Sequence, residues 1–189
     1  MGHSQAEKAN SRARILKEAA EQIRDGGLES VSVHKLMRSV DLTHGGFYGH
    51  FASRSELLAQ ALERALLDGE AAARSAADPG KPRNFSTMIR SYLSRTHRDS
   101  RKTGCGVAAL AADVGRADHN ARAVMEVHIE RFIAELKRAL GTDDDKQAMV
   151  VMSAAVGALT LSRVMTDTKR SDALLRAVRD YLLAFENAK

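Results

Sequence analysis

The fold is decided by the stretch Val40-Asp41-Leu42-Thr43-His44-Gly45-Gly46-Phe47-Tyr48-Gly49-His50-Phe51. Residues 31–40 place apolar side chains at helical spacing, so this stretch begins where one short helix ends. Asp41 stands at a sharp turn, because aspartate tolerates left-handed backbone angles better than most side chains. Thr43 suits the N-cap of a second short helix. Two short helices joined in this way form a helix-turn-helix, whose second helix can enter the major groove of DNA.

Longer amphipathic helices are predicted on both sides of this motif. The one before it ends at Gly26-Gly27, and the one after it starts at Ser53, with Glu56 as the partner in a capping box. The apolar face of the preceding helix consists of Ile15, Leu16, Ala19, Ala20 and Ile23.

With these helices in place, the chain resembles the TetR/AcrR family of transcriptional regulators over roughly residues 10–67. The resemblance depends above all on Phe47-Tyr48-Gly49-His50-Phe51 running into Ser53-Arg54-Ser55-Glu56-Leu57-Leu58, although the family's usual turn glycine is Asp41 here. It implies an all-α fold of about nine helices. An amino-terminal three-helix DNA-binding domain would cover residues 1–55, and a larger helical domain for effector binding and dimerisation would cover 56–189.

The second helix of the motif suggests how DNA would be contacted. Thr43-His44 would lie at its amino end, where backbone amides and the helix dipole favour a phosphate. Gly45-Gly46 cost roughly 1 kcal/mol each against alanine in a helix interior, which suggests that something approaches the backbone closely. Tyr48, His50 and Arg54 resemble phosphate-contacting positions of the family; the alternative is a plain helical hairpin with a loosened turn. The predicted DNA-binding residues are Ser32, Val33, His34, Thr43, His44, Gly45, Gly46, Tyr48, His50 and Arg54.

The charge of the chain does not itself indicate DNA binding. The formal net charge is +5, but residues 1–75 hold ten Lys and Arg against ten Asp and Glu. The surplus of cations therefore lies in the remainder of the chain, and the motif must support the DNA-binding prediction.

Composition favours an all-α protein of the cytoplasm. Apolar residues make up 44 % of the 189 residues without strand-like alternation, and both prolines lie within Pro79-Gly80-Lys81-Pro82. We expect no signal peptide and no membrane association, since the start is polar and no run of 18 apolar residues occurs. The single cysteine excludes an internal disulfide.

Six helices are predicted after the motif, broken by glycine and proline at 79–82 and by glycine around Cys105. Asp143-Asp144-Asp145 is interpreted as a helix start. A metal site is the alternative, but the run lacks the alternating spacing and the glycine of a calcium loop, and we predict no metal or other cofactor. The predicted helices cover 53–77, 84–99, 107–114, 117–140, 145–166 and 171–187.

Helix 145–166 is apolar nearly all round, so it should be buried on more than one side. In TetR-like proteins the last two helices pair with their symmetry mates, and the resemblance therefore implies a homodimer. The alternative is an ordinary core helix. The predicted interface consists of Leu159, Val164, Leu174, Val178 and Leu182.

Cys105 is predicted at the amino end of a short helix, after the cations Arg95, Arg98, Arg101 and Lys102. A helix amino terminus and nearby cations favour thiolate, so Cys105 is a candidate sensor of electrophiles or oxidants. Residues 104–110 also resemble a Gly-Cys-Pro-hydrophobic-Ala-Ala-Leu signature of a TetR subgroup, with glycine in place of proline. Inert pocket lining is the alternative, because free cysteine is often buried. The predicted effector pocket, expected to be apolar, comprises Cys105, Phe85, Met88, Tyr92, Leu110, Met125, Phe132, Met152 and Val156.

The predicted function is that of a homodimeric repressor, released from a palindromic operator in double-stranded DNA by a small apolar molecule or a redox effector. The alternatives are an activator and a helical protein-interaction module without DNA readout. An enzyme is the weakest alternative. The sequence has no Gly-rich phosphate loop, Gly-x-Ser-x-Gly, Cys-x-x-Cys or His-Glu-x-x-His pattern, and no catalytic residue is predicted.

Overall fold

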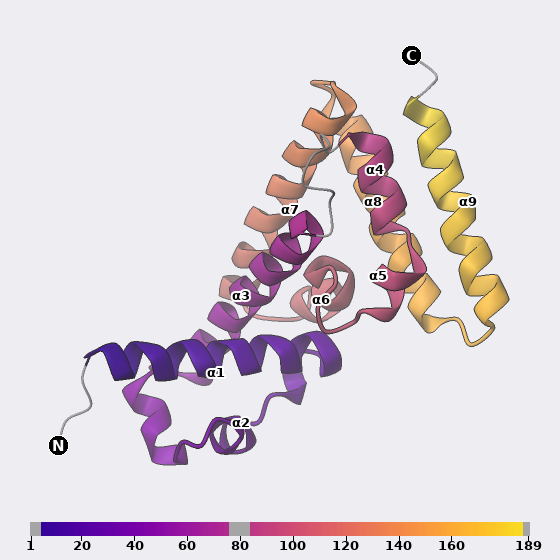
Figure 1. The fold of residues 1–189 in the computed structure, drawn as a ribbon. Coiled ribbons are helices and arrows are strands. Elements are labelled where there is room, and N and C mark those ends of the chain that lie inside the picture. Colours follow the sequence, from indigo (N-terminus) through magenta and orange to yellow (C-terminus); the bar gives the residue numbers. More distant parts are fainter. Residues whose placement is uncertain (1–4, 76–83, 187–189) are drawn as a thin grey trace.

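The computed structural model describes residues 5–75 and 84–186, and every regular element in these ranges is a helix. The predicted break at Pro79-Gly80-Lys81-Pro82 lies outside the described residues. The first part of the chain forms α1 (Gln5–Gly26), the 3-10 turn η1 (Leu28–Ser30), α2 (Val33–Ser39), the 3-10 helix η2 (His44–Gly49) and α3 (Arg54–Ser75). In Figure 1, α1 lies across the foot of α3 with α2 beyond it, so α1, α2 and η2 occupy one end of the molecule.

The turn of the predicted helix-turn-helix is confirmed in detail. Asp41 adopts the left-handed conformation, with φ of 58°. The Thr43 hydroxyl accepts a hydrogen bond from the Gly46 amide at 3.2 Å, as an N-cap should. The helix that follows is of the 3-10 type rather than α. Three glycines within its six residues weaken α-helix propensity, and the bond from the Gly46 amide to the Thr43 carbonyl, at 3.0 Å, has 3-10 spacing.

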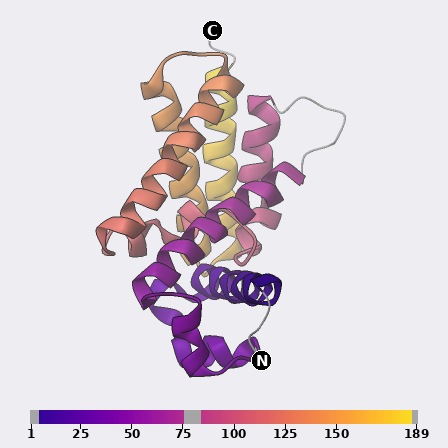
Figure 2. The same cartoon turned by 90° about the vertical axis from the view of Figure 1, so that its left-hand side faces the viewer.

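A capping box starts α3, as predicted. The Glu56 amide donates to the Ser53 hydroxyl at 3.1 Å, and the Glu56 carboxylate accepts from the Ala52 amide at 2.7 Å. Helix α3 then runs from the amino-terminal end of the molecule into the second group of helices, which Figure 2 shows from the side.

The second part of the chain forms α4 (Phe85–Tyr92), α5 (Arg95–Asp99), α6 (Gly106–Val114), α7 (His119–Leu140), α8 (Asp145–Val164) and α9 (Thr168–Glu186). The predicted single helix over 84–99 is wrong, because it is two helices. The Ser94 hydroxyl caps α5 by accepting from the His97 amide at 3.1 Å, and the Tyr92 carbonyl bonds the His97 ring at 2.7 Å. These side-chain bonds replace the backbone ladder that would have continued α4.

The remaining helix ends follow the predicted signals. Gly141 ends α7 with φ of 61°, a left-handed conformation that suits glycine. Asp144 caps α8 by accepting from the Lys146 amide at 2.9 Å, so the aspartate run is a helix start.

Two buried clusters form the core. The first joins α1, α2, η2 and α3 to α6 and the start of α7, and the second joins α4, α7, α8 and α9. The first cluster crosses the boundary that we predict between residues 55 and 56, so the helices before this boundary are packed directly against α6 and the start of α7.

Helix α8 is long and apolar enough to cross a membrane by length and composition alone. In this fold α8 packs between α7 and α9, and 33 % of its most apolar window is buried.

Candidate DNA-reading surface and effector cavity

The predicted DNA-binding residues gather on α2, on η2 and at the start of α3, at the end of the molecule away from α4 and α9 (Figure 1). Tyr48 is 70 % exposed, whereas its neighbours Phe47 and Phe51 are buried with ring centroids 5.6 Å apart. Tyr48 thus projects outwards from an aromatic anchor. Of the other nine, Ser32, His34, Thr43, His44 and Gly45 are exposed, and Val33, Gly46, His50 and Arg54 are half-buried.

The glycines of η2 have little need to be glycine within the protein. A Cβ atom built on Gly45 or Gly49 would meet no atom within 4 Å, and one on Gly46 would lie 3.4 Å from the Thr43 hydroxyl, an ordinary contact. None of the three has a positive φ. Neither packing within the protein nor backbone conformation therefore requires glycine at these three positions.

Arginines near the motif are engaged within the protein. Arg54 bonds the Glu29 carboxylate at 3.2 Å and the Val31 carbonyl at 3.4 Å, which ties the start of α3 to the segment before α2. Arg12 pairs with Glu56 at 3.2 Å and lies over the Phe51 ring. Arg54 thus has a structural role beside the phosphate contact that we predict for it.

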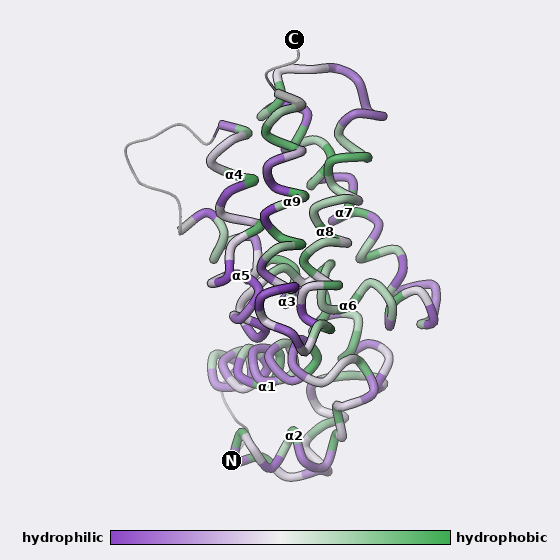
Figure 3. The backbone as a smooth tube through the Cα atoms, turned by 90° about the vertical axis from the view of Figure 1, so that its right-hand side faces the viewer, coloured by the Kyte–Doolittle hydropathy of each residue, from purple (hydrophilic) through white to green (hydrophobic). Residues whose placement is uncertain are grey.

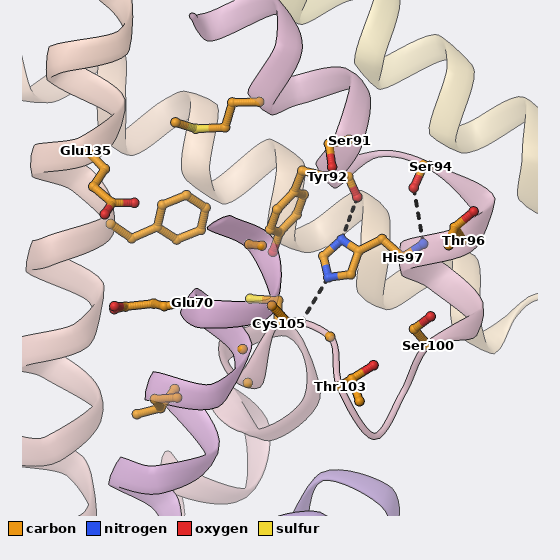
Figure 4. Close-up of a pocket in the computed structure, with 18 of the residues that line it drawn as sticks. Glu70, Ser91, Tyr92, Ser94, Thr96, His97, Ser100, Thr103, Cys105 and Glu135 are labelled. Atoms are coloured by element: carbon orange, nitrogen blue, oxygen red, sulfur yellow. Dashed lines mark hydrogen bonds between the residues drawn. The ribbon is translucent and has the colours of Figure 1, made fainter. Parts of the chain in front are cut away.

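A cavity of about 420 Å³ lies between α3, α4, α5, α7 and the segment that leads into α6 (Figure 4). Four of the predicted pocket residues line it, namely Met88, Tyr92, Cys105 and Phe132. The other five do not. Phe85, Leu110 and Met125 are buried within the two core clusters, and Met152 and Val156 pack against those clusters from half-buried positions.

The lining of the cavity is mostly apolar, as expected, but polar side chains contribute to it as well. Helices α3 and α7 contribute Glu70, His128 and Glu135, residues that sequence reasoning did not place in the pocket. Polar residues on amphipathic helices normally face solvent, so no pattern in the sequence marks these three as inward. The remaining polar lining residues are Ser91, Ser94, Thr96, His97, Ser100 and Thr103.

Cys105 is the N-cap residue of α6 and is half-buried. Its backbone amide donates to His97 Nε2 at 2.9 Å, and His97 Nδ1 lies 2.7 Å from the Tyr92 carbonyl. These two bonds together require a neutral ring with its proton on Nδ1. Burial lowers the pKa of His97, and the Arg163 guanidinium lowers it further, although the bond to Tyr92 opposes both effects.

The four cations that precede Cys105 in sequence bond elsewhere. Arg95 and Arg98 pair with Asp172 at 2.9 and 2.8 Å, Arg101 donates to the Arg163 carbonyl, and Lys102 lies near Asp25. The cation that interacts electrostatically with Cys105 is Arg163 of α8, far away in sequence. It is held by the carbonyls of His97 and Arg98, at 3.1 and 3.0 Å.

Gly69 and Gly106 bring α3 into direct contact with the segment around Cys105. A Cβ atom on Gly69 would lie 2.9 Å from the Gly104 carbonyl oxygen, and one on Gly106 would lie 3.0 Å from the Leu66 side chain. A Cβ on Gly104 would meet the Ser100 carbonyl oxygen at 2.7 Å. The segment around Cys105 is therefore packed directly against α3, whose first residue is Arg54.

The predicted dimer residues fall in different environments. Leu159 and Leu182 are buried in the protomer core, Leu174 and Val178 are half-buried, and Val164 is 74 % exposed. The placement of Leu159 and Leu182 at an interface is therefore wrong, because both side chains are already covered by their own protomer. The apolar face that α8 leaves open consists of Val150, Gly157, Leu161 and Val164, which fall on one side at 100° per residue. In Figure 3, which shows the backbone from the right-hand side of Figure 1, α8 and α9 lie next to each other.

No cluster of three or more metal-ligating side chains occurs among residues 5–75 and 84–186.

Comparison with known proteins agrees with this architecture. Residues 15–61 match the family model of bacterial regulatory proteins of the tetR family. No curated protein matches the chain. The amino-terminal part is therefore a helix-turn-helix domain of the TetR type.

Solved structures resemble the chain over almost its whole length. One is Escherichia coli NemR in its reduced form, with a TM-score of 0.74 and 20 % identity, covering 92 % of this chain and 95 % of that one. Another is a TetR-family regulator from Cytophaga hutchinsonii, with a TM-score of 0.76 and 17 % identity, covering 96 % and 98 %. A third, from Chloroflexus aurantiacus, has a TM-score of 0.75 and 17 % identity, covering 95 % and 97 %. The fold is that of TetR-family transcriptional regulators.

Proposed function

We propose that this protein is a cytoplasmic, homodimeric repressor that binds an inverted repeat in double-stranded DNA and leaves it when an effector enters the cavity. The observation that carries the proposal is η2, an exposed element of a TetR-type domain whose glycines have no intramolecular reason and whose Tyr48 points outwards. Two such elements in a dimer would read major grooves about 34 Å apart.

Selection of bound genomic fragments tests the DNA-binding part. We expect an inverted repeat among the enriched fragments, with binding that weakens steeply as salt rises, because phosphate contacts dominate affinity in such domains. Sequence-independent binding at moderate salt would contradict the proposal. No binding at all would favour a helical protein-interaction module.

The dimer would form through α8 and α9, on the exposed face defined by Val150, Gly157, Leu161 and Val164. A small residue such as Gly157 permits close helix approach, and a Cβ there would meet nothing within 4 Å. Leu174 and Val178 of α9 are half-buried in the protomer and would be covered further by a partner.

The route from cavity to DNA would run through α3 and α6. Helix α6 starts at the Cys105 cap and ends near Asp113, whose carboxylate accepts from the Leu28 amide at 3.1 Å. Leu28 starts η1, directly before the helix-turn-helix. A coupling of about 1–3 kcal/mol between effector and DNA would suffice for regulation.

A covalent reaction at Cys105 would act on DNA binding through the same two helices, α3 and α6. Its position in the cavity wall favours reaction with an α,β-unsaturated carbonyl, whose β-carbon would bond the sulfur while the α-carbon takes the thiol proton. The similar NemR structure is described as a reduced form, which makes a redox response worth testing here. A non-covalent effector beside an inert Cys105 is the alternative.

A further inference from the structure

The charged residues that line the cavity are both acidic. They are Glu70 of α3 and Glu135 of α7, and no Lys or Arg lines the cavity in the part of the chain that the structure describes. We infer that the cavity takes an organic cation, with its ammonium group against Glu70 and Glu135 and its apolar body on the rings of Tyr92 and Phe132. This rests on the proposed function only in treating the cavity as the effector site.

The histidine beside Glu70 does not cancel its charge. His128 Nδ1 lies 2.9 Å from Glu70 Oε1, and both side chains are largely buried. Burial lowers the pKa of His128 and outweighs the neighbouring carboxylates, so the ring is neutral at neutral pH and donates its Nδ1 proton. The bond orients the Glu70 carboxylate and leaves its negative charge in place.

Arg74 compensates the two carboxylates only in part. One of its guanidinium nitrogens lies 3.1 Å from Glu70 and 3.2 Å from Glu135, so two carboxylates share one cation. The Arg74 side chain is 58 % exposed, and solvent screens its attraction. A cation inside the cavity would be screened less and would meet both carboxylates from the other side.

The rest of the wall suits the body of an aromatic or aliphatic amine. The rings of Tyr92 and Phe132 have centroids 5.7 Å apart, and Met88 lies in the same lining. Aromatic faces attract cations, and a methionine adapts to irregular apolar shapes. In Figure 4 the two glutamates lie on one side of the cavity and His97 lies on the other. One ligand could therefore contact the glutamates at one end and the polar residues around His97 at the other.

The Tyr92 hydroxyl indicates a second polar contact. It is buried against the cavity beside the Cys105 thiol, and it makes no hydrogen bond to an oxygen or nitrogen atom of the described residues. Burial, and after it the neighbouring Cys105 thiol, raises the pKa of Tyr92 well above its usual value, so the group stays a neutral phenol. A ligand oxygen or N–H would satisfy it. Anionic ligands are disfavoured, because they would face two carboxylates with no cation in the lining.

Calorimetric titration of the full chain with three matched probes tests this inference. The probes are 4-phenylbutylamine, 4-phenylbutanol and 4-phenylbutyrate, which share one body and differ in charge. We expect the amine to bind at least about tenfold more tightly than the carboxylate, with the alcohol between them. Equal affinities, a preference for the carboxylate, or no binding of any probe would overturn the inference.

Substitutions then locate the charge effect. Glu135→Gln should weaken amine binding about tenfold, and so should Glu70→Gln, which keeps an acceptor for His128. The control is Glu126→Gln, because Glu126 lies exposed on the same helix as Glu135, outside the cavity lining, and its change removes the same charge. Equal weakening by Glu126→Gln and Glu135→Gln would overturn the inference. If Glu70→Gln does not fold, Glu135→Gln and the three probes decide. Because the titration contains no DNA, a failure of amine binding can be distinguished from a failure of DNA binding.

Discussion

The two ends of this molecule differ in the sequence separation of the residues whose contacts define their structure. At the DNA-reading end, turn and cap residues such as Asp41, Thr43 and Ser53 act on neighbours a few positions away. Around the cavity, the decisive contacts join residues far apart, such as Glu70 with His128 and Arg163 with His97. Local chemistry specifies the first end, whereas tertiary packing specifies the second.

The largest effect on folding and assembly should come from placing a charge at a buried and, for comparison, at an exposed leucine of α8. Leu159→Glu should unfold the protein or lower its stability by several kcal/mol, because it buries a charge in the protomer core. Leu161→Glu, two residues on, should leave the fold intact and yield monomers. Thermal denaturation and analytical ultracentrifugation of both variants check this. A stable dimer from Leu161→Glu would remove the proposed interface.

The contact between α3 and the Cys105 segment should be the next most sensitive feature. Gly69→Ala places a methyl group 2.9 Å from the Gly104 carbonyl oxygen, so it should cost about 1–3 kcal/mol despite better helix propensity. Gly115→Ala at the end of α6 is the control, because its Cβ would make only ordinary contacts, from 3.4 Å. Chemical denaturation compares the two. Equal changes in the free energy of unfolding would show that the contact at Gly69 accommodates a methyl group without loss of stability.

These two predictions also show what the sequence could and could not foretell. Helical spacing and caps predicted nearly every helix boundary. The break between α4 and α5 at Ser94 was not predicted, because it depends on the His97 ring bonding the Tyr92 carbonyl. Leu159 and Leu161 are the same residue type, two positions apart in the sequence. Only the three-dimensional packing shows that Leu159 is buried and Leu161 is exposed. Glu70 and Glu135 look like ordinary solvent-facing residues until the cavity between α3 and α7 is known.

Buried histidines should make stability depend on pH. Burial lowers the pKa of both His97 and His128, so the unfolded chain takes up protons more readily than the folded one. Their contribution is complete above the unfolded value of about 6.5 and is lost as the pH falls below it. The unfolding temperature should therefore fall between pH 7.5 and 5.5, with a smaller fall in His128→Gln, which can still donate to Glu70. An unfolding temperature that rises on acidification would contradict this assignment.

The smallest effect on fold and DNA affinity should come from Cys105→Ser, because serine keeps the backbone bond to His97. We expect DNA binding within about threefold of the wild type and, if Cys105 is a sensor, no release by α,β-unsaturated carbonyls. Alkylation followed by intact-mass measurement, together with release from DNA, checks this. Slow alkylation and unchanged release in Cys105→Ser would leave the cysteine as cavity lining.

Paired histidine substitutions test most directly whether η2 reads DNA. His44 lies exposed on η2, and His119 lies exposed at the start of α7, outside the predicted DNA-binding set. Fluorescence anisotropy would compare His44→Ala, His119→Ala and wild type on the selected inverted repeat and on a scrambled duplex. We expect binding to the repeat to be at least about tenfold weaker for His44→Ala and unchanged for His119→Ala. Equal affinities of both variants and the wild type for the repeat would contradict this expectation.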